Sequence, residues 1–159
     1  MLLRTKPVTV GEDLLLFRAV DEPARREMAE QLLDSGMGGR RWRQPGNVDL
    51  WELHDATLGP DDRPVAAAGT RPLGDGRRVR LVAAGVAASH RGRGIGRRMI
   101  EDLCDGLRAR GVMVLVAAVP SDLAAGLVVL QQAGLRPSYV ERSSPEADGR
   151  DVVWFDVNL

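Results

Sequence analysis

The stretch Arg91-Gly92-Arg93-Gly94-Ile95-Gly96 decides the fold of this chain, because it places a glycine-rich turn between a predicted strand and a predicted helix. Glycine lets the backbone adopt positive φ angles and approach a ligand closely. The N–H groups in the first turn of the following helix have no partner within the helix and lie at the positive end of its dipole. Such a turn is typical of an anion-binding site, and phosphate oxygens suit it.

The sequence on both sides of the turn supports this interpretation. Residues 79–87 are apolar and bounded by charged residues, which is typical of a buried strand. After the turn, apolar residues recur at steps of three and four up to Gly111, a typical helix end. Residues 112–119 predict a second buried strand, and residues 121–133 predict a helix that begins at a Ser-Asp pair and ends at Gly134.

The rest of the chain predicts further strands on both sides of this unit. The remaining predicted elements are a strand at 13–20, a helix at 22–34, strands at 48–54 and 65–71, and strands at 138–142 and 151–157. This order predicts an α/β fold with a mixed, mostly antiparallel central sheet of about seven strands flanked by helices. We expect one domain over residues 1–159.

Two familiar phosphate motifs do not fit the turn. A P-loop requires Gly-Lys followed by Ser or Thr, and the dinucleotide fingerprint requires a glycine where Arg97 or Met99 stands. The pattern Arg/Gln-x-x-Gly-x-Gly/Ala, matched by Arg91, Gly94 and Gly96, resembles instead the pyrophosphate-binding signature of the GNAT superfamily of acyl-CoA-dependent N-acyltransferases. The order of strands and helices is similar to that family over about two thirds of the chain.

The resemblance implies an acetyl-CoA-dependent N-acetyltransferase in which a splayed strand pair holds the acyl-pantetheine arm. On matching positions, the arm pairs with backbone groups near Ala84 and Val86, and the phosphates are held around the turn. The implied phosphate-binding residues are Arg91, Gly92, Arg93, Gly94, Ile95, Gly96 and Arg97. The implied acceptor is an amine of a small molecule or peptide. An acyl-CoA-binding module with little or no turnover is the alternative.

Attack of an amine on a thioester requires a donor for the oxyanion and a base for the amine. We expect an interruption of the strand at Gly85 to supply a backbone N–H for the oxyanion. An aliphatic amine with a pKa near ~10 is mostly protonated at neutral pH. Glu52 and His54 are the candidate catalytic residues, because two-residue alternation puts both on one face of a strand. The alternative is that they are polar residues of a half-solvated strand.

The sequence departs from the family in the second predicted helix after the turn. Many GNAT members carry a tyrosine where Leu130 stands, and asparagine and alanine where Leu123 and Gly126 stand. Leucine cannot protonate a departing thiolate. A thiol pKa near ~8.5 makes the CoA thiolate a tolerable leaving group, which solvent can protonate. This departure motivates the binding-module alternative.

Composition limits the partners. The 22 basic and 22 acidic residues cancel, which argues against nucleic acid as a partner. No segment approaches the ~20 apolar residues of a membrane span, so we predict no membrane partner and a cytoplasmic protein. The single Cys104 lies on the apolar face of a predicted helix and is expected to be a buried thiol. We predict no metal site.

Three tryptophans and the last predicted strand carry further expectations. Trp42 and Trp51 are candidates for the wall of an acceptor pocket, and Trp154 is expected in the core. His90, beside the turn, is either an exposed loop residue or a phosphate ligand. An exposed strand at 151–157 would allow pairing with a second copy, so a homodimer is possible.

Overall fold

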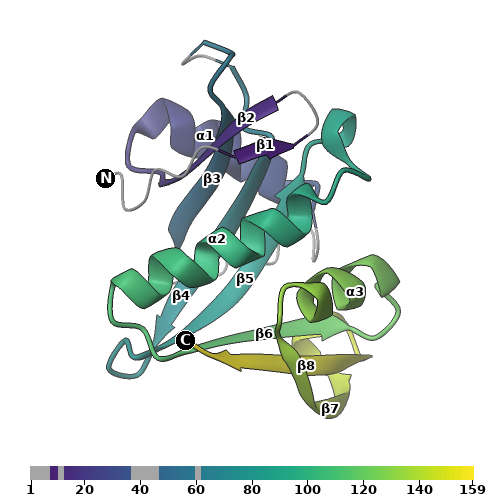
Figure 1. Ribbon diagram of the computed structural model, residues 1–159. Helices are drawn as coiled ribbons and strands as arrows, with labels where there is room; N and C mark the ends of the chain where they lie inside the picture. Colours follow the sequence, from purple (N-terminus) through teal and green to yellow (C-terminus); the bar gives the residue numbers. More distant parts are fainter. Residues whose placement is uncertain (1–7, 11–12, 37–46, 60–61) are drawn as a thin grey trace.

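The structure is a computed structural model that describes residues 8–10, 13–36, 47–59 and 62–159. The described strands form one eight-stranded sheet in the order β1-β2-β3-β4-β5-β6-β8-β7 (Figure 1). The strands are β1 Val8–Val10, β2 Asp13–Ala19, β3 Asp49–Asp55, β4 Ala66–Leu73, β5 Arg78–Val86, β6 Val114–Pro120, β7 Arg136–Ser144 and β8 Arg150–Asn158. The helices are α1 Pro23–Asp34, α2 Ile95–Ala109 and α3 Ala124–Gln132, with short 3-10 helices η2 Ala88–His90 and η3 Pro145–Ala147.

The sheet is mixed and mostly antiparallel, as predicted. Among the described strands, the one parallel pair is β5 with β6, which α2 connects. The short strand β1 adds to the predicted strands, and it pairs with β2. Helix α1 packs against β3, β4 and β5 on one face of the sheet, and α2 and α3 lie together on the other face (Figure 1). The predicted α/β fold with flanking helices is confirmed.

Apolar residues form one core on each face of the sheet. The larger core lies under α2 and α3, where the Phe17 and Trp51 rings stack with centroids 5.5 Å apart. Helix α2 approaches this pair closely, since a Cβ added to Gly106 would lie 3.1 Å from the Phe17 ring. The smaller core lies under α1 and includes Leu33 and Leu50. Burial on both faces makes the sheet a rigid support for the turn between β5 and α2.

Strands β5 and β6 part halfway along their length. They pair only from Arg78 with Val114 to Leu81 with Ala117. Beyond this point β5 stays paired with β4 through Val86, and β6 stays paired with β8 through Pro120. The two strands therefore leave an opening in the sheet, which we call the split. The predicted splayed strand pair is confirmed.

A β-bulge lies at Val82, directly where the split begins. Gly69 of β4 faces Ala83 and Thr70 faces Leu81, so Val82 is the extra residue. A bulge reverses the alternation of side chains. Leu81 therefore points to the larger core, Ala83 to the smaller core, and Ala84 again to the larger one. The prediction of an interruption at Gly85 was wrong, because Gly85 pairs regularly with Ala67.

Two other expectations fail on the C-terminal part of the chain. Strand β8 lies between β6 and β7, so it is not an exposed edge and cannot pair with a second copy in the predicted way. The edge on this side of the sheet is β7. Helix α3 begins at Ala124 with Leu123 as its N-cap, and no side chain caps it. The Asp122 carboxylate pairs with Arg150 at 3.3 Å instead.

Among the helices of the described residues, none is long and apolar enough to cross a membrane.

Candidate active site

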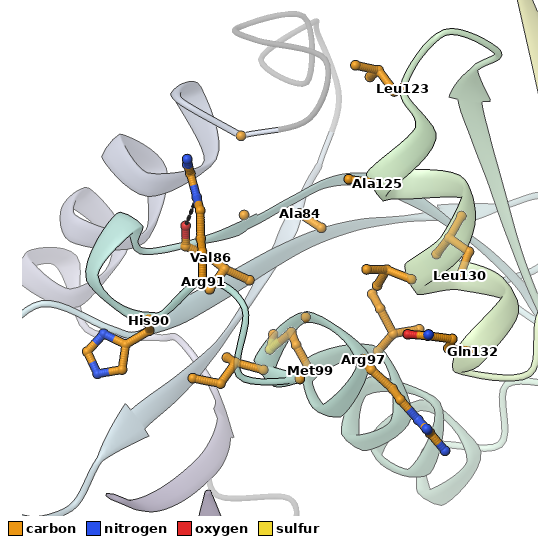
Figure 2. Close-up of a pocket in the computed structure, with 18 of the residues that line it drawn as sticks. Ala84, Val86, His90, Arg91, Arg97, Met99, Leu123, Ala125, Leu130 and Gln132 are labelled. Carbon is orange, nitrogen blue, oxygen red and sulfur yellow. Dashed lines mark hydrogen bonds between the residues drawn. The ribbon is translucent and has the colours of Figure 1, made fainter. Parts of the chain in front are cut away.

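A cavity of about 800 Å3 lies at the split, between β5, the turn that begins α2, and α3. Figure 2 shows Ala84 and Val86 along β5, Arg91 and Arg97 at the two ends of the turn, and Leu130 on the α3 wall. The predicted cofactor-binding residues that line it are Ala84, Val86, Arg91, Gly92, Gly94, Ile95, Gly96 and Arg97. Arg93 is exposed and does not line it. The structure therefore brings eight of the nine predicted residues to one cavity.

The turn has the geometry of an anion-binding site. Gly92 and Gly94 have φ angles of 79° and 76°, in the left-handed region that favours glycine. No atom lies within 4 Å of a Cβ built on either glycine, so a ligand can approach the backbone there. Gly94 is the N-cap of α2, and its carbonyl accepts the first helical hydrogen bond from Arg98 N at 3.1 Å. The backbone N–H groups of the first helical turn are therefore available to a phosphate.

Strand β5 directs backbone groups of Ala84 and Val86 to the split. Ala87 N donates to Val65 O at 2.8 Å, so the backbone groups of Ala87 face β4. Because the hydrogen-bonding direction alternates along an antiparallel strand, the backbone groups of Gly85 also face β4, and those of Ala84 and Val86 face the split. The Val86 carbonyl accepts a hydrogen bond from Arg91 Nε at 3.3 Å (Figure 2). An extended amide-bearing chain could therefore pair with this edge as an extra strand does.

The end of α1 closes one side of the cavity by close backbone contact. A Cβ on Gly36 would lie 2.4 Å from the Ala84 carbonyl oxygen, and a Cβ on Gly85 would lie 3.0 Å from the Leu32 carbonyl oxygen. Only glycine at these two positions permits the approach. Ser35 and Gly36 line the cavity together with Ala67, whose side chain belongs to the smaller core. The cavity therefore passes through the split from the α2 face to the α1 face of the sheet.

The cavity floor is aliphatic. Leu81, Met99, Ile100 and Leu130 line it and are each almost fully buried. Leu130 on α3 occupies the position for which the sequence resemblance implies a tyrosine, so α3 contributes no hydroxyl there. The polar side chains of the lining are Ser35, His90, Arg91, Arg97, Asp122 and Gln132.

The arginines at the turn differ in how they are held. Arg97 Nε pairs with Glu101 at 2.6 Å on the exposed side of α2. Arg98 Nε pairs with the buried Asp102 carboxylate at 3.0 Å and is thereby held away from a ligand. Arg91 contacts only a carbonyl among its described hydrogen bonds, which leaves its positive charge uncompensated there. His90 lines the cavity beside Arg91, and its Nδ1 lies 2.8 Å from Ser89 Oγ.

Glu52 and His54 lie away from this cavity. They share one face of β3, as predicted, and that face packs under α1. Glu52 is completely buried, and its carboxylate is 2.7 Å from Arg18 Nε and 3.0 Å from an Arg25 guanidinium nitrogen. The same Arg25 nitrogen lies 3.4 Å from His54 Nδ1. Neither candidate base lines the cavity, and the ion pairs give Glu52 a structural role.

Burial sets the protonation of two groups outside the cavity. Burial lowers the pKa of His54, and the neighbouring Arg18 and Arg25 charges lower it further. Burial also raises the pKa of the Cys104 thiol to about 11, which disfavours the nucleophilic thiolate, and the predicted buried thiol is confirmed. Within the described ranges, no three His, Cys, Asp or Glu side chains are grouped so that they could hold a metal ion.

The tryptophans are placed differently from the expectations. Trp51 is completely buried in the larger core and donates from Nε1 to Thr70 Oγ1 at 2.9 Å, so its predicted role in an acceptor pocket was wrong. Trp42 lies outside the described residues. Trp154 is only partly buried, because it lies on the face of β8 opposite α3. The alternating sequence pattern predicted strand β8 correctly, but it did not show which face of β8 is covered by a helix.

Comparison with solved structures shows the fold. The chain is similar to a Bacillus subtilis acetyltransferase in complex with CoA, with a TM-score of 0.71 and 13% identity over 91% of this chain and 99% of that one. It is similar to the ribosomal-protein-S18-alanine N-acetyltransferase of Escherichia coli, with a TM-score of 0.65 and 21% identity over 91% and 93%. A putative acetyltransferase of Salmonella typhimurium with acetyl-CoA matches with a TM-score of 0.64 and 16% identity over 91% and 94%.

Comparison with protein families assigns the chain to a family, whereas the structural similarities show only the fold. No curated protein sequence matches the chain. The model of the acetyltransferase (GNAT) family matches residues 22–128, which is 107 of the 159 residues. This range contains the split, the turn and the start of α3. The chain belongs to the GNAT acetyltransferase family, whose acyl donor is acetyl-CoA.

Proposed function

We propose that this protein transfers an acetyl group from acetyl-CoA to a primary amine of a small molecule or peptide, by direct attack of the amine on the thioester. The observation that carries the proposal is the continuity of the cavity, which joins the anion-binding turn to the free edge of β5. The neighbouring N-acetyltransferase of Escherichia coli, which acts on a ribosomal-protein alanine, supports an amine acceptor.

The residues of the turn and of β5 fit the donor. Backbone N–H groups of Ile95, Gly96 and Arg97 point out of the first turn of α2, where they would hold a pyrophosphate. Arg91 adds a guanidinium that binds phosphate oxygens with two hydrogen bonds. Gly92 and Gly94 shape this cradle through their positive φ angles, and Arg93 lies between them in the chain but outside the cavity lining. The backbone groups of Ala84 and the backbone N–H of Val86, which face the split, would hold the amides of the pantetheine arm.

The proposed reaction requires few functional groups from side chains. Acetyl-CoA supplies an activated carbonyl with a thiolate leaving group of pKa near ~8.5, which water can protonate. Backbone N–H groups of β5 at the split are fixed donors for an oxyanion and require no reorganisation. The aliphatic floor offers an apolar surface to the thioester. A role of Glu52 or His54 as the base would need water molecules to carry the proton, because neither residue lines the cavity.

A second candidate function is an acyl-CoA-binding module with little or no turnover. Leu130 favours it, since α3 offers no proton donor at the position of the family tyrosine. The absence of an acidic or imidazole group from the buried floor, among the described residues, points the same way. We propose a cytoplasmic location for either function, in line with a chain whose single cysteine is a buried thiol.

Calorimetry followed by a thiol assay separates the two functions. Acetyl-CoA and desulfo-CoA are titrated first. The protein with acetyl-CoA is then offered polyamines, amino acids, aminoglycosides and peptide N-termini while free thiol is recorded. Binding with thiol release on one amine supports the transferase and names its acceptor class. Binding without release on any amine favours the module, and failure to bind either ligand overturns both.

A further inference from the structure

A stack of three side chains lies on the sheet face opposite α3. The Tyr139 and Trp154 rings are stacked with centroids 5.9 Å apart and an interplanar angle of 15°. The Arg80 guanidinium carbon lies over the Trp154 ring, 4.8 Å from its centroid. Arg80 is held there by the Glu146 carboxylate at 2.7 Å. Tyr139 ends the stack, and it is 58% exposed, so part of its ring is open to solvent.

The register of the strands places this stack at the level of the split. Ala118 follows Ala117, the last residue of β6 that pairs with β5. Ala118 faces Trp154 on β8, and Trp154 faces Tyr139 on β7. The three residues therefore form one row that begins at the split and runs across β8 to the sheet edge. Two strand spacings separate β6 from β7, so Tyr139 lies roughly 10 Å from the split.

The row lies on the same face of the sheet as α1. Val153 and Phe155 pack toward α2 and α3, so Trp154 points to the opposite face. The cavity lining includes Ser35 and Gly36, at the end of α1 on that opposite face. The phosphate-binding turn lies at the start of α2, on the other face (Figure 1). Donor and acceptor can therefore enter from different sides.

The charge around Tyr139 suits a cation. Glu141 is two residues along β7, on the same face, and its Oε2 accepts a hydrogen bond from Trp154 Nε1 at 3.1 Å. Its Oε1 makes no hydrogen bond to the described part of the chain. An exposed aromatic ring next to a carboxylate attracts an ammonium or guanidinium group through its π face. The neighbouring Trp154 ring already holds the Arg80 guanidinium in this manner.

We propose that Tyr139 and Glu141 form a subsite for the acceptor, which binds a second positive charge about 10 Å from the reacting amine. The inference rests on the proposed function and narrows its acceptor to diamines, polyamines and other amines with a distant cationic group. The Tyr139 ring contacts the second cation, and Glu141 balances its charge. A monoamine of the same length has no group for this subsite.

The test measures binding directly, so that it does not depend on turnover. Diaminooctane and octylamine are titrated by calorimetry into the protein alone and into the protein saturated with CoA. The variants are Tyr139→Ala, Tyr139→Phe and Glu141→Gln. Val140→Ala is the matched control, because Val140 is 55% exposed on the same strand but faces the other side of the sheet. A series from diaminopropane to diaminodecane then measures the preferred spacing.

We expect Tyr139→Ala to weaken diaminooctane binding roughly two- to fivefold, which is the size of an exposed cation–π contact, with octylamine unaffected. Tyr139→Phe retains the wild-type affinity because the ring is kept, and Glu141→Gln weakens only the diamine. If CoA binds and Tyr139→Ala leaves diamine affinity unchanged, or weakens both ligands equally, the subsite is refuted while the proposed function stands. If CoA does not bind but diamine affinity still depends on Tyr139, the proposed function fails and the acceptor subsite fails with it, which leaves only a cation-binding site at Tyr139 and Glu141.

Discussion

Neutralising Glu52 by the substitution Glu52→Gln separates its structural role from a catalytic one. The carboxylate is completely buried between Arg18 and Arg25, with nitrogen–oxygen distances of 2.7 and 3.0 Å. Breaking a buried pair and leaving its partner charged costs about 3–5 kcal/mol. For a chain of this size, 1 kcal/mol lowers Tm by about 2–4 °C, so we expect a fall of about 6–20 °C.

The assay is thermal and urea unfolding followed by circular dichroism, with CoA affinity measured well below the lowered Tm. Glu101→Gln is the control, because it removes a carboxylate 2.6 Å from Arg97 on the exposed side of α2 and should cost less than about 1 kcal/mol. A Glu52→Gln protein that keeps its stability and CoA affinity but loses roughly 100-fold in turnover would refute this reasoning and make Glu52 the base.

The remaining predictions concern one cavity residue and two buried groups. Leu130→Tyr should turn over roughly tenfold faster than Leu130→Phe, because the hydroxyl protonates the thiolate; equal rates contradict a limiting proton transfer. The folded pKa of His54 lies below 6.5, so the unfolded chain binds more protons and stability should fall as pH drops below about 7. His54→Gln should flatten this pH dependence in urea unfolding, and a variant that keeps the full dependence would contradict the assignment. Cys104, with a pKa of about 11, should resist iodoacetamide until the chain unfolds, and rapid labelling of the native protein would show that the thiol is accessible.

Local signals predicted the elements and the phosphate end of the site. Gly92 and Gly94 mark positive φ angles that other residues rarely adopt, so the turn is readable from residue type. The periodicity of residues 95–107 predicted the amphipathic face of α2 because the period of a helix is local. Alternation placed Glu52 and His54 on one face of β3 for the same reason.

The features that the sequence did not predict depend on contacts between residues far apart in the chain. Glu52 meets Arg25, 27 residues earlier, only because α1 packs on that face of β3. Neighbouring positions along β8 did not reveal that this strand lies inside the sheet, since strand order follows from the whole topology. The bulge at Val82 has no residue-type signal, yet it determines which side chains of β5 face the cavity.

Calorimetric titration of CoA into the wild type, Gly94→Val and Gly111→Val tests the central claim most directly. Both glycines have positive φ angles, 76° and 84°, with open space around a Cβ, so the backbone strain of a β-branched residue is matched at the two sites. Only Gly94 lies in the turn that begins α2. We predict that the wild type and Gly111→Val bind CoA and that Gly94→Val loses most of this affinity while remaining folded. Equal CoA affinity in all three proteins would contradict the assignment of the turn as the phosphate-binding site.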